Sequence, residues 1–138
     1  MSDKPQRPSP RISPDNAPFW EACARGELHL PCCDACGEPH LPPGPVCPHC
    51  LSPDLTWRMA SGRGVVSSWT MLHQPGLPAF EDQIPYNIVQ VETDEGPRLT
   101  ATLVSDNGEP PRIGQRVQVE FIRLENGVAL PVFRPVEA

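Results

Sequence analysis

Two closely spaced cysteine pairs constrain the fold of this chain more than any other feature. Cys33 and Cys36 form one C-x-x-C motif, Cys47 and Cys50 form a second, and ten residues separate the two motifs. Each motif favours a tight turn whose backbone amides point at the sulfur atoms, and two such turns supply the four thiolates of a structural zinc site. Because four cysteines leave no open position on the ion, the spacing predicts a stabilising metal without catalytic water.

Other potential ligands lie close to this set. Cys32 offers a C-x-x-x-C alternative, but Cys33 is preferred because it makes the two motifs, CDAC and CPHC, equal in length. His40 and His49 lie inside the same segment, and with four cysteines available we expect them to be surface residues or to lie behind the ligands. We expect Cys23 to be a small buried apolar residue. Iron in rubredoxin-type geometry and unligated reduced cysteines are alternatives, whereas a redox C-x-x-C is disfavoured because no thioredoxin-like pattern is present.

Chain size explains why a metal is needed. The chain has 138 residues, 20 of them proline, and a hydrophobic fraction of 38%, which is a weak basis for a large core. The first residues contain no apolar signal segment, and no apolar run approaches the roughly 20 residues of a membrane-spanning helix. We therefore expect a cytoplasmic protein, and in that compartment paired C-x-x-C motifs favour metal over disulfides.

The order of elements predicts three parts. Residues 1–14 contain four prolines and three basic residues and are predicted to be a disordered tail. Residues 15–60 are predicted to hold a short helix over about 17–25 followed by the metal-binding ribbon. The helix has Pro18 in its first turn, Asp15 or Asn16 as a cap and Gly26 as a stop.

Residues 61–138 show the period-two alternation of β-strands and are predicted to form one β-domain. The turn Asn126-Gly127 is a strong hairpin signal. Five short antiparallel strands without a long helix favour a small closed barrel, an OB-fold. The helix usual between its third and fourth strands is absent from the pattern, because residues 106–114 are few and include two prolines. The predicted strands cover residues 65–70, 88–92, 99–103, 117–121 and 128–132.

Four stretches of the sequence resemble one known family. They are FWEACARGELHLPCCDACGEPHLPPGPVCPHC, SGRGVVSSWTMLHQPGLPAFEDQIPYNIVQVETDEGPRL, GQRVQVEF and the closing LPVFRP. The family joins a rubredoxin-like zinc ribbon to an OB-fold, and the resemblance covers about residues 16–136. It implies a mainly β protein in which a short N-terminal helix and the ribbon precede a five-stranded antiparallel barrel.

The resemblance also implies a helper. Family members are encoded or fused with thiolase-like enzymes that act on acyl-CoA thioesters; they bridge or stabilise those subunits and can contribute to the pocket near CoA. One branch partners thiolase-like aldolases that shorten steroid side chains by retro-aldol cleavage, and others serve an acetyltransferase or the early mevalonate pathway. This chain is similar to stand-alone bacterial members of the aldolase-partner type. The resulting hypothesis is a non-catalytic, zinc-binding subunit of a hetero-oligomer, with a stand-alone acyl-CoA-binding module as the alternative.

The residues themselves also favour a helper. The sequence has no G-x-S-x-G, P-loop or G-x-G-x-x-G motif, and no catalytic residue is predicted. His73 is the only plausible acid–base residue outside the ribbon, and a single histidine at a strand end is more often structural. Apolar side chains in the helix, in the loop after the first barrel strand and in the last strand are predicted to contact a protein partner. They are Phe19, Trp20, Leu77, Phe80, Tyr86 and Phe133.

The charge of the chain argues against nucleic acid as a partner. The formal net charge is −6, whereas nucleic-acid grooves carry basic tracks with stacking aromatic residues. Four arginines near the C-terminus are predicted to form a solvated face. A sharper hypothesis is that one or two of them contact CoA phosphates, but no CoA-binding residue is assigned. The four arginines near the C-terminus are Arg112, Arg116, Arg123 and Arg134.

Overall fold

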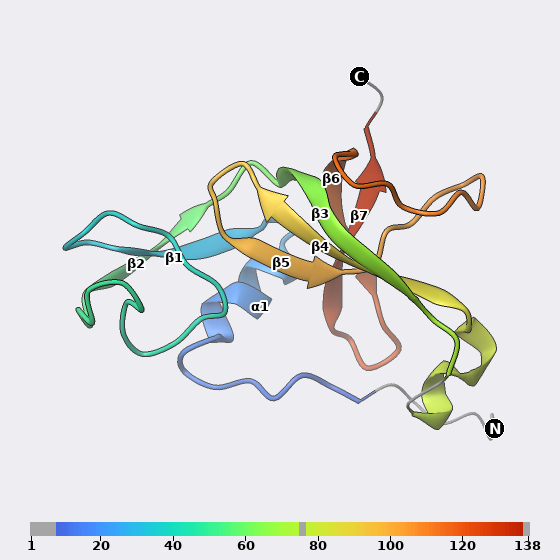
Figure 1. Cartoon of the computed structure of the whole chain (residues 1–138). Coiled ribbons are helices and arrows are strands. Elements are labelled where there is room, and N and C mark those ends of the chain that lie inside the picture. Colours follow the sequence, from blue (N-terminus) through green and yellow to red (C-terminus); the bar gives the residue numbers. More distant parts are fainter. Residues whose placement is uncertain (1–7, 75–76, 137–138) are drawn as a thin grey trace.

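A computed structural model describes residues 8–74 and 77–136 (Figure 1). Within these residues the chain is mainly β, with one α-helix, α1 (Ala17–Ala24), and one 3₁₀ helix, η1 (Pro78–Gln83). A two-stranded sheet holds the cysteines and a five-stranded sheet follows it. The strands are β1 (His29–Cys33), β2 (Leu55–Met59), β3 (Arg63–Leu72), β4 (Tyr86–Thr93), β5 (Arg98–Ala101), β6 (Arg116–Arg123) and β7 (Ala129–Pro135).

Helix α1 confirms the predicted helix and ends one residue earlier. Proline lies in its first turn, where a missing amide hydrogen costs nothing. Asn16 occupies the N-cap position without a side-chain cap bond; its Oδ1 accepts a hydrogen bond from the Ser13 amide instead, at 2.8 Å. Gly26, which follows the C-cap residue Arg25, has φ +80° and donates its amide to the Cys23 carbonyl at 2.9 Å.

The five-stranded sheet has the order β5-β4-β3-β6-β7, and every pair in it is antiparallel. A parallel bridge between Leu103 and Phe133 joins its two edges. The Phe133 amide donates to the Thr102 carbonyl at 3.0 Å, and the Val104 amide donates to the Phe133 carbonyl at 2.7 Å. Strand order and closure together are those of an OB-fold, which confirms the predicted fold.

The long strand β3 is curved and pairs with β6 along one edge and with β4 along the other. Its first residues pair with β6, and its pairing with β4 extends as far as Leu72. The register shifts between Val66 and Ser68, and such a bulge bends a strand and increases its twist. The curved sheet encloses a core of branched and aromatic side chains, namely Val66, Val89, Val91, Leu103, Val117 and Phe133.

A second cluster of buried side chains joins the ribbon to the barrel. Phe19 and Cys23 of α1 pack together with Ala129 of β7 and with two leucines of the ribbon, Leu28 just before β1 and Leu30 within it. Figure 1 shows α1, in blue, beside β1 and near the lower part of β7. The guanidinium of Arg123 adds a hydrogen bond to the Ala24 carbonyl at 3.0 Å. The helix, which is too short to be stable alone, is therefore held between the two sheets. We call this cluster of buried side chains the junction core.

Several details refine or leave open the sequence predictions. Residues 102–115 contain no helix, as predicted, and β5 ends at Ala101 because Leu103 is used for barrel closure. The first half of the predicted tail, residues 1–7, lies outside the described residues, so the tail and the boundaries at residues 14 and 60 stay predictions. Among the described residues, no helix combines the length and apolar character needed to cross a bilayer.

Candidate metal centre

Two turns of the ribbon present the cysteines in the same way. In the first turn the Cys36 amide donates to Cys33 Sγ at 3.4 Å, and the Gly37 amide donates to the Cys33 carbonyl at 2.8 Å. In the second, the amides of His49 and Leu51 donate to the Sγ and the carbonyl of Cys47 at 3.3 and 2.8 Å. The two turns share the carbonyl bond from the amide four residues on, but the sulfur accepts from the third residue in the first turn and from the second residue in the other.

The second turn carries backbone strain that the first one avoids. Gly37 has φ +81° and Leu51, at the matching position, has φ +67°. Glycine adopts this left-handed conformation at no steric cost, whereas leucine does so at a cost of about 1 kcal/mol. The Leu51 side chain is 71% exposed, so little packing offsets the strain, and the sequence motif alone gave no signal of it.

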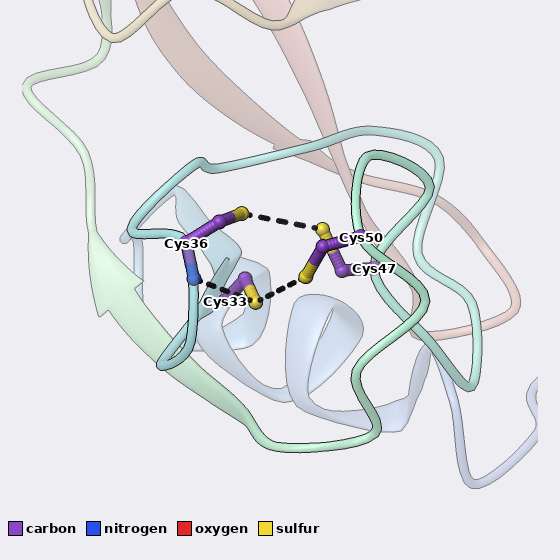
Figure 2. A group of neighbouring side chains, drawn as sticks. All are labelled: Cys33, Cys36, Cys47 and Cys50. Carbon is purple, nitrogen blue, oxygen red and sulfur yellow. Dashed lines mark hydrogen bonds between the residues drawn. The ribbon is translucent and has the colours of Figure 1, made fainter.

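The four predicted cysteines come together in one cluster (Figure 2). The Sγ atoms of Cys33 and Cys50 are 3.5 Å apart, and those of Cys36 and Cys47 are 3.6 Å apart. All four Sγ atoms lie within 4.8 Å of one another, and none forms a disulfide. Tetrahedral zinc with bonds of about 2.3 Å separates its sulfur ligands by about 3.8 Å, so the cluster fits a single ion.

The charges of these thiols favour a cation at their centre. The Cys36 amide, opposed by burial, lowers the pKa of Cys33 to about 7. The Glu38 amide lowers the pKa of Cys36, but burial and the neighbouring thiols raise it to about 12 in total. The sulfur of Cys33 is thus readily ionised, while that of Cys36 resists a second negative charge. A divalent ion removes this conflict, because it stabilises all four thiolates.

The remaining cysteines lie outside the cluster. Cys32 donates its thiol to the Leu30 carbonyl at 3.7 Å and is half-buried. Cys23 lies in the junction core, where burial raises its pKa to about 12, and this confirms its predicted role as a small apolar residue. The structure therefore brings Cys33, and not Cys32, into the group that could hold a metal.

The two histidines of the ribbon differ sharply. His49 is exposed, as expected. The side chain of His40 is only 4% exposed, and neither ring nitrogen has a hydrogen-bond partner among the described residues. Burial lowers the pKa of His40, with a smaller contribution from His49. His40 is therefore held as a neutral ring, which the sequence did not indicate.

The predicted partner contacts occupy two different environments. Phe19 is buried in the junction core and Trp20 is half-buried, with their ring centroids 5.1 Å apart in an edge-to-face arrangement. Leu77 is 46% exposed, and the half-buried rings of Phe80 and Tyr86 lie 5.9 Å apart. Figure 1 shows η1 extending from the barrel.

Phe133 requires a correction. Its exposed fraction is 0%, because its backbone closes the barrel and its side chain fills the core. A side chain in that position offers no surface to a partner, so the predicted partner contact at Phe133 is wrong. Phe19, at 7% exposed, is also mainly a core residue.

Most of the predicted arginine face is engaged within the chain. The guanidinium of Arg134 bonds Glu120 and Asp106, each at 2.9 Å, and Arg123 bonds the Ala24 carbonyl. Arg116 lies 3.9 Å from Asp94. The side chain of Arg112 makes no ion pair with any described residue, so the four arginines do not form a continuous free track.

Comparisons with known proteins agree with this arrangement. Residues 20–56 match a model described as the ChsH2 rubredoxin-like zinc ribbon domain, and residues 57–121 match the ChsH2 C-terminal OB-fold domain. A chain of a solved structure titled "Ltp2-ChsH2(DUF35) aldolase" is 40% identical, with a TM-score of 0.81, over 92% of this chain and 98% of that one. The chain belongs to the ChsH2 family.

Two curated relatives, both named as hydratase alpha subunits, are much longer than this chain. The "Probable enoyl-CoA hydratase alpha subunit" of Thermomonospora curvata is 41% identical over 96% of this chain, which spans 41% of that relative. The "3-oxo-4,17-pregnadiene-20-carboxyl-CoA hydratase alpha subunit" of Mycobacterium tuberculosis is 32% identical over 82% of this chain and 35% of its own length. The ribbon match and the four clustered thiols confirm the predicted structural zinc in this member of the family.

Proposed function

We propose that this chain is a non-catalytic, zinc-binding subunit of a thiolase-like enzyme that acts on acyl-CoA thioesters. The observation that carries the proposal is the close similarity to one chain of the Ltp2-ChsH2(DUF35) aldolase, which extends over nearly all of that chain. By the same resemblance, the enzyme is a thiolase-like aldolase that shortens steroid side chains. The Mycobacterium tuberculosis relative, named for a pregnadiene carboxyl-CoA substrate, supports a steroid acyl-CoA.

We assign the zinc ion to Cys33, Cys36, Cys47 and Cys50, because their sulfur atoms lie at the separations of tetrahedral coordination. With four thiolate ligands the ion contributes folding energy and has no site for substrate. Backbone amides of the two turns donate hydrogen bonds to the sulfurs and hold the two cysteine loops in place. The ribbon thereby becomes a rigid platform beside the barrel.

The proposed partner contacts are Trp20, Leu77, Phe80 and Tyr86. Leu77 is exposed, and it precedes a short helix that begins with Pro78 and is followed by Pro85. Apolar side chains on a rigid loop lose little conformational freedom on docking, which favours them as anchors. We expect the partner to cover this loop and one side of the ribbon, to be stabilised by the contact and to have its CoA site shaped in part by this chain.

Two features support this proposal over nucleic-acid binding. The chain carries a net charge of −6, and three of the four arginines near its C-terminus have carboxylate or carbonyl neighbours within the chain. A cluster of reduced thiols is also compatible with the cytoplasm, which we propose as the compartment.

The test is a native pull-down of the tagged full chain from its own cell extract, with quantitative mass spectrometry. We expect a thiolase-like protein in about equal amount, and at least about tenfold less of it with Leu77→Asp, since a buried charge opposes apolar docking. Ile122→Asp is the matched control, because Ile122 is 38% exposed but lies on β6. Recovery of the chain alone, or equal losses in both variants, would contradict the proposal.

The role of the ribbon needs a separate variant. Cys36→Ser removes one proposed zinc ligand while leaving the barrel core untouched. We expect it to lose metal and partner together. If the partner still binds normally to the metal-free variant, the ribbon is not part of the interface and only the loop remains in the proposal.

A further inference from the structure

One edge of β3 lacks a partner strand over its second half. On that edge β3 pairs with β6 only over residues 63–65, and the amide and carbonyl of Val66 bond the turn before β6. From there on, residues 68–72 pair with β4 alone within the part of the chain that the structure describes. Figure 1 shows β3, in green, and β4, in yellow, running side by side toward η1. An unpaired edge of this kind offers backbone donors and acceptors to another strand.

The pairing with β4 shows which backbone groups face outward on this edge. In an antiparallel pair, residues whose amide and carbonyl face the partner alternate with residues whose groups face away from it. Val66 directs its groups away from β4, and the register shift that follows adds one residue to β3. The alternation then places the outward groups at Trp69 and Met71, while those of Thr70 face Ile88 of β4. Among the described residues, no backbone bond outside the β4 ladder involves Trp69 or Met71.

The edge also lacks the devices that keep strands from pairing. Edge strands of soluble proteins are commonly protected by charged side chains or by proline. Residues 64–80 contain no Asp, Glu, Lys or Arg, although these types make up 20% of the chain, and β3 contains no proline. Trp69 is 37% exposed and belongs to neither core cluster of the described residues. Because the chain has a net charge of −6, two copies repel each other, and this neutral edge lets them meet without opposing like charges.

The edge is complementary to itself. Antiparallel pairing of two copies about Thr70 places Trp69 of each copy opposite Met71 of the other, so the outward groups of both strands meet. Each of these pairs then exchanges two backbone hydrogen bonds, and the same contact is made twice about the two-fold axis. The Thr70 side chains face each other at the axis, and each Met71 thioether lies beside an indole ring, which are both favourable contacts. A shift of one residue would bring outward groups opposite inward ones and lose the bonds.

We propose that two copies of this chain associate through the free edges of β3, residues 68–72, and form one continuous antiparallel sheet. The contact is small, because five residues of each strand bury less surface than a stable dimer needs. We therefore expect a reversible dimer with a dissociation constant of about 10–100 µM. The inference concerns the isolated chain and does not depend on the proposed partner subunit, so either can fail while the other stands.

The test is sedimentation equilibrium of the zinc-loaded full chain over about 1–500 µM. We expect a monomer–dimer equilibrium. Thr70→Lys places two like charges at the two-fold axis and should raise the dissociation constant at least about tenfold. Thr100→Lys is the matched control, because Thr100 is also exposed but lies on β5, and it should leave the association unchanged. Dispersed amide resonances of both variants show that each has folded.

A mixture of two charge variants tests the register. Thr70→Lys and Thr70→Asp should each fail to dimerise alone, whereas an equimolar mixture should associate, because opposite charges then meet at the axis. Hydrogen exchange gives a second readout: the amides of Trp69 and Met71 should exchange more slowly as the concentration rises. The Thr70 amide, which faces β4, should be protected at every concentration.

Three results would overturn the proposal. The first is a chain that stays monomeric up to about 500 µM, which would leave this edge to an extended segment of a different protein. The second is an equal loss of association in Thr100→Lys and Thr70→Lys, which would place the contact away from β3. The third is a mixture of Thr70→Lys and Thr70→Asp that does not associate, which would mean that Thr70 does not lie on the two-fold axis.

Discussion

The ribbon and the barrel reach stability by different means. In the ribbon, β2 has no fully buried side chain and β1 buries Leu30, Pro31 and the ligand Cys33, whereas β7 of the barrel buries Ala129, Pro131, Val132 and Phe133. The ribbon instead gathers four thiols within 4.8 Å. The difference shows how one short chain can hold two structured parts: one excludes water from apolar side chains, and the other replaces that core with metal ligands.

The largest effect should come from Cys47→Ser. Cys47 is fully buried and supplies one of the four sulfurs, and structural zinc contributes about 10 kcal/mol or more of binding energy that is coupled to folding. We expect zinc content to fall from about one ion per chain to near zero. Amide resonances of the ribbon should collapse while those of β4 in the barrel remain dispersed, as measured by elemental analysis and NMR.

Cys32→Ser is the control for this prediction, because Cys32 neighbours the cluster without joining it. It should keep zinc and the ribbon resonances. Loss of zinc in Cys32→Ser with retention in Cys33→Ser would reverse the ligand assignment. Loss of the β4 resonances in Cys47→Ser would show that the barrel does not stand without the metal.

A core truncation should produce the opposite result. Phe133→Ala should lower the free energy of unfolding of the barrel by about 3–5 kcal/mol, because it leaves a cavity where β7 closes onto Leu103. Urea denaturation followed at barrel residues measures the loss. Ile113→Ala, 73% exposed, should change it by less than about 0.5 kcal/mol. Equal effects of the two would mean that Phe133 is not part of the core.

The two cysteine turns allow a comparison within the ribbon. Leu51→Gly should relieve the strain at φ +67° and stabilise the metal-bound ribbon by about 1 kcal/mol, or about fivefold in zinc affinity. Gly37→Ala should do the reverse, since φ is +81° there and no atom lies within 4 Å of the added Cβ. Competition with a chromophoric chelator measures both. A weaker affinity for Leu51→Gly would show that the leucine side chain contributes packing.

The smallest effect concerns pH. Because burial lowers the pKa of His40 below its ordinary 6.5, the unfolded chain takes up a proton that the folded chain does not. The stability that this residue gives is therefore present above pH 6.5 and declines as pH falls below it. His40→Leu removes this pH-dependent contribution. The free energy of unfolding of the variant relative to the parent should therefore be greater at about pH 5.5 than at about pH 7.5. Chemical denaturation at both values measures it.

His49→Gln is the control for His40, since His49 is exposed and makes the smaller contribution to the lowered pKa of His40, so this variant should keep most of the pH dependence of the parent. If His40→Leu loses stability by the same amount at both values, the ring serves packing alone and its protonation has no part in acid sensitivity.

Local chemistry explains what the sequence could predict. Equal C-x-x-C spacings identify the four clustered cysteines without any tertiary information, because ligand type and turn length decide the geometry. The helix over residues 17–24 followed from its proline and glycine signals. Alternating patterns also located five barrel strands, because one face of each meets the core.

Tertiary closure explains what the sequence could not predict. Phe133 belongs to the core because β7 meets Leu103 across the barrel, and no local pattern contains that distant contact. Likewise, the neutral state of His40 results from burial by surrounding elements. The strain at Leu51 arises because a residue other than glycine occupies the position that glycine fills in the first turn.

The junction core has a consequence for the geometry of the whole chain. Phe19, Leu28 and Ala129 belong to one packed cluster although they come from the helix, the ribbon and the last strand. The ribbon and the barrel are thus joined through one packed cluster, so their relative spacing is set before anything binds. A partner that contacts both the ribbon and the barrel would therefore meet a preorganised surface. Binding would not incur the entropy cost of fixing two independently moving domains.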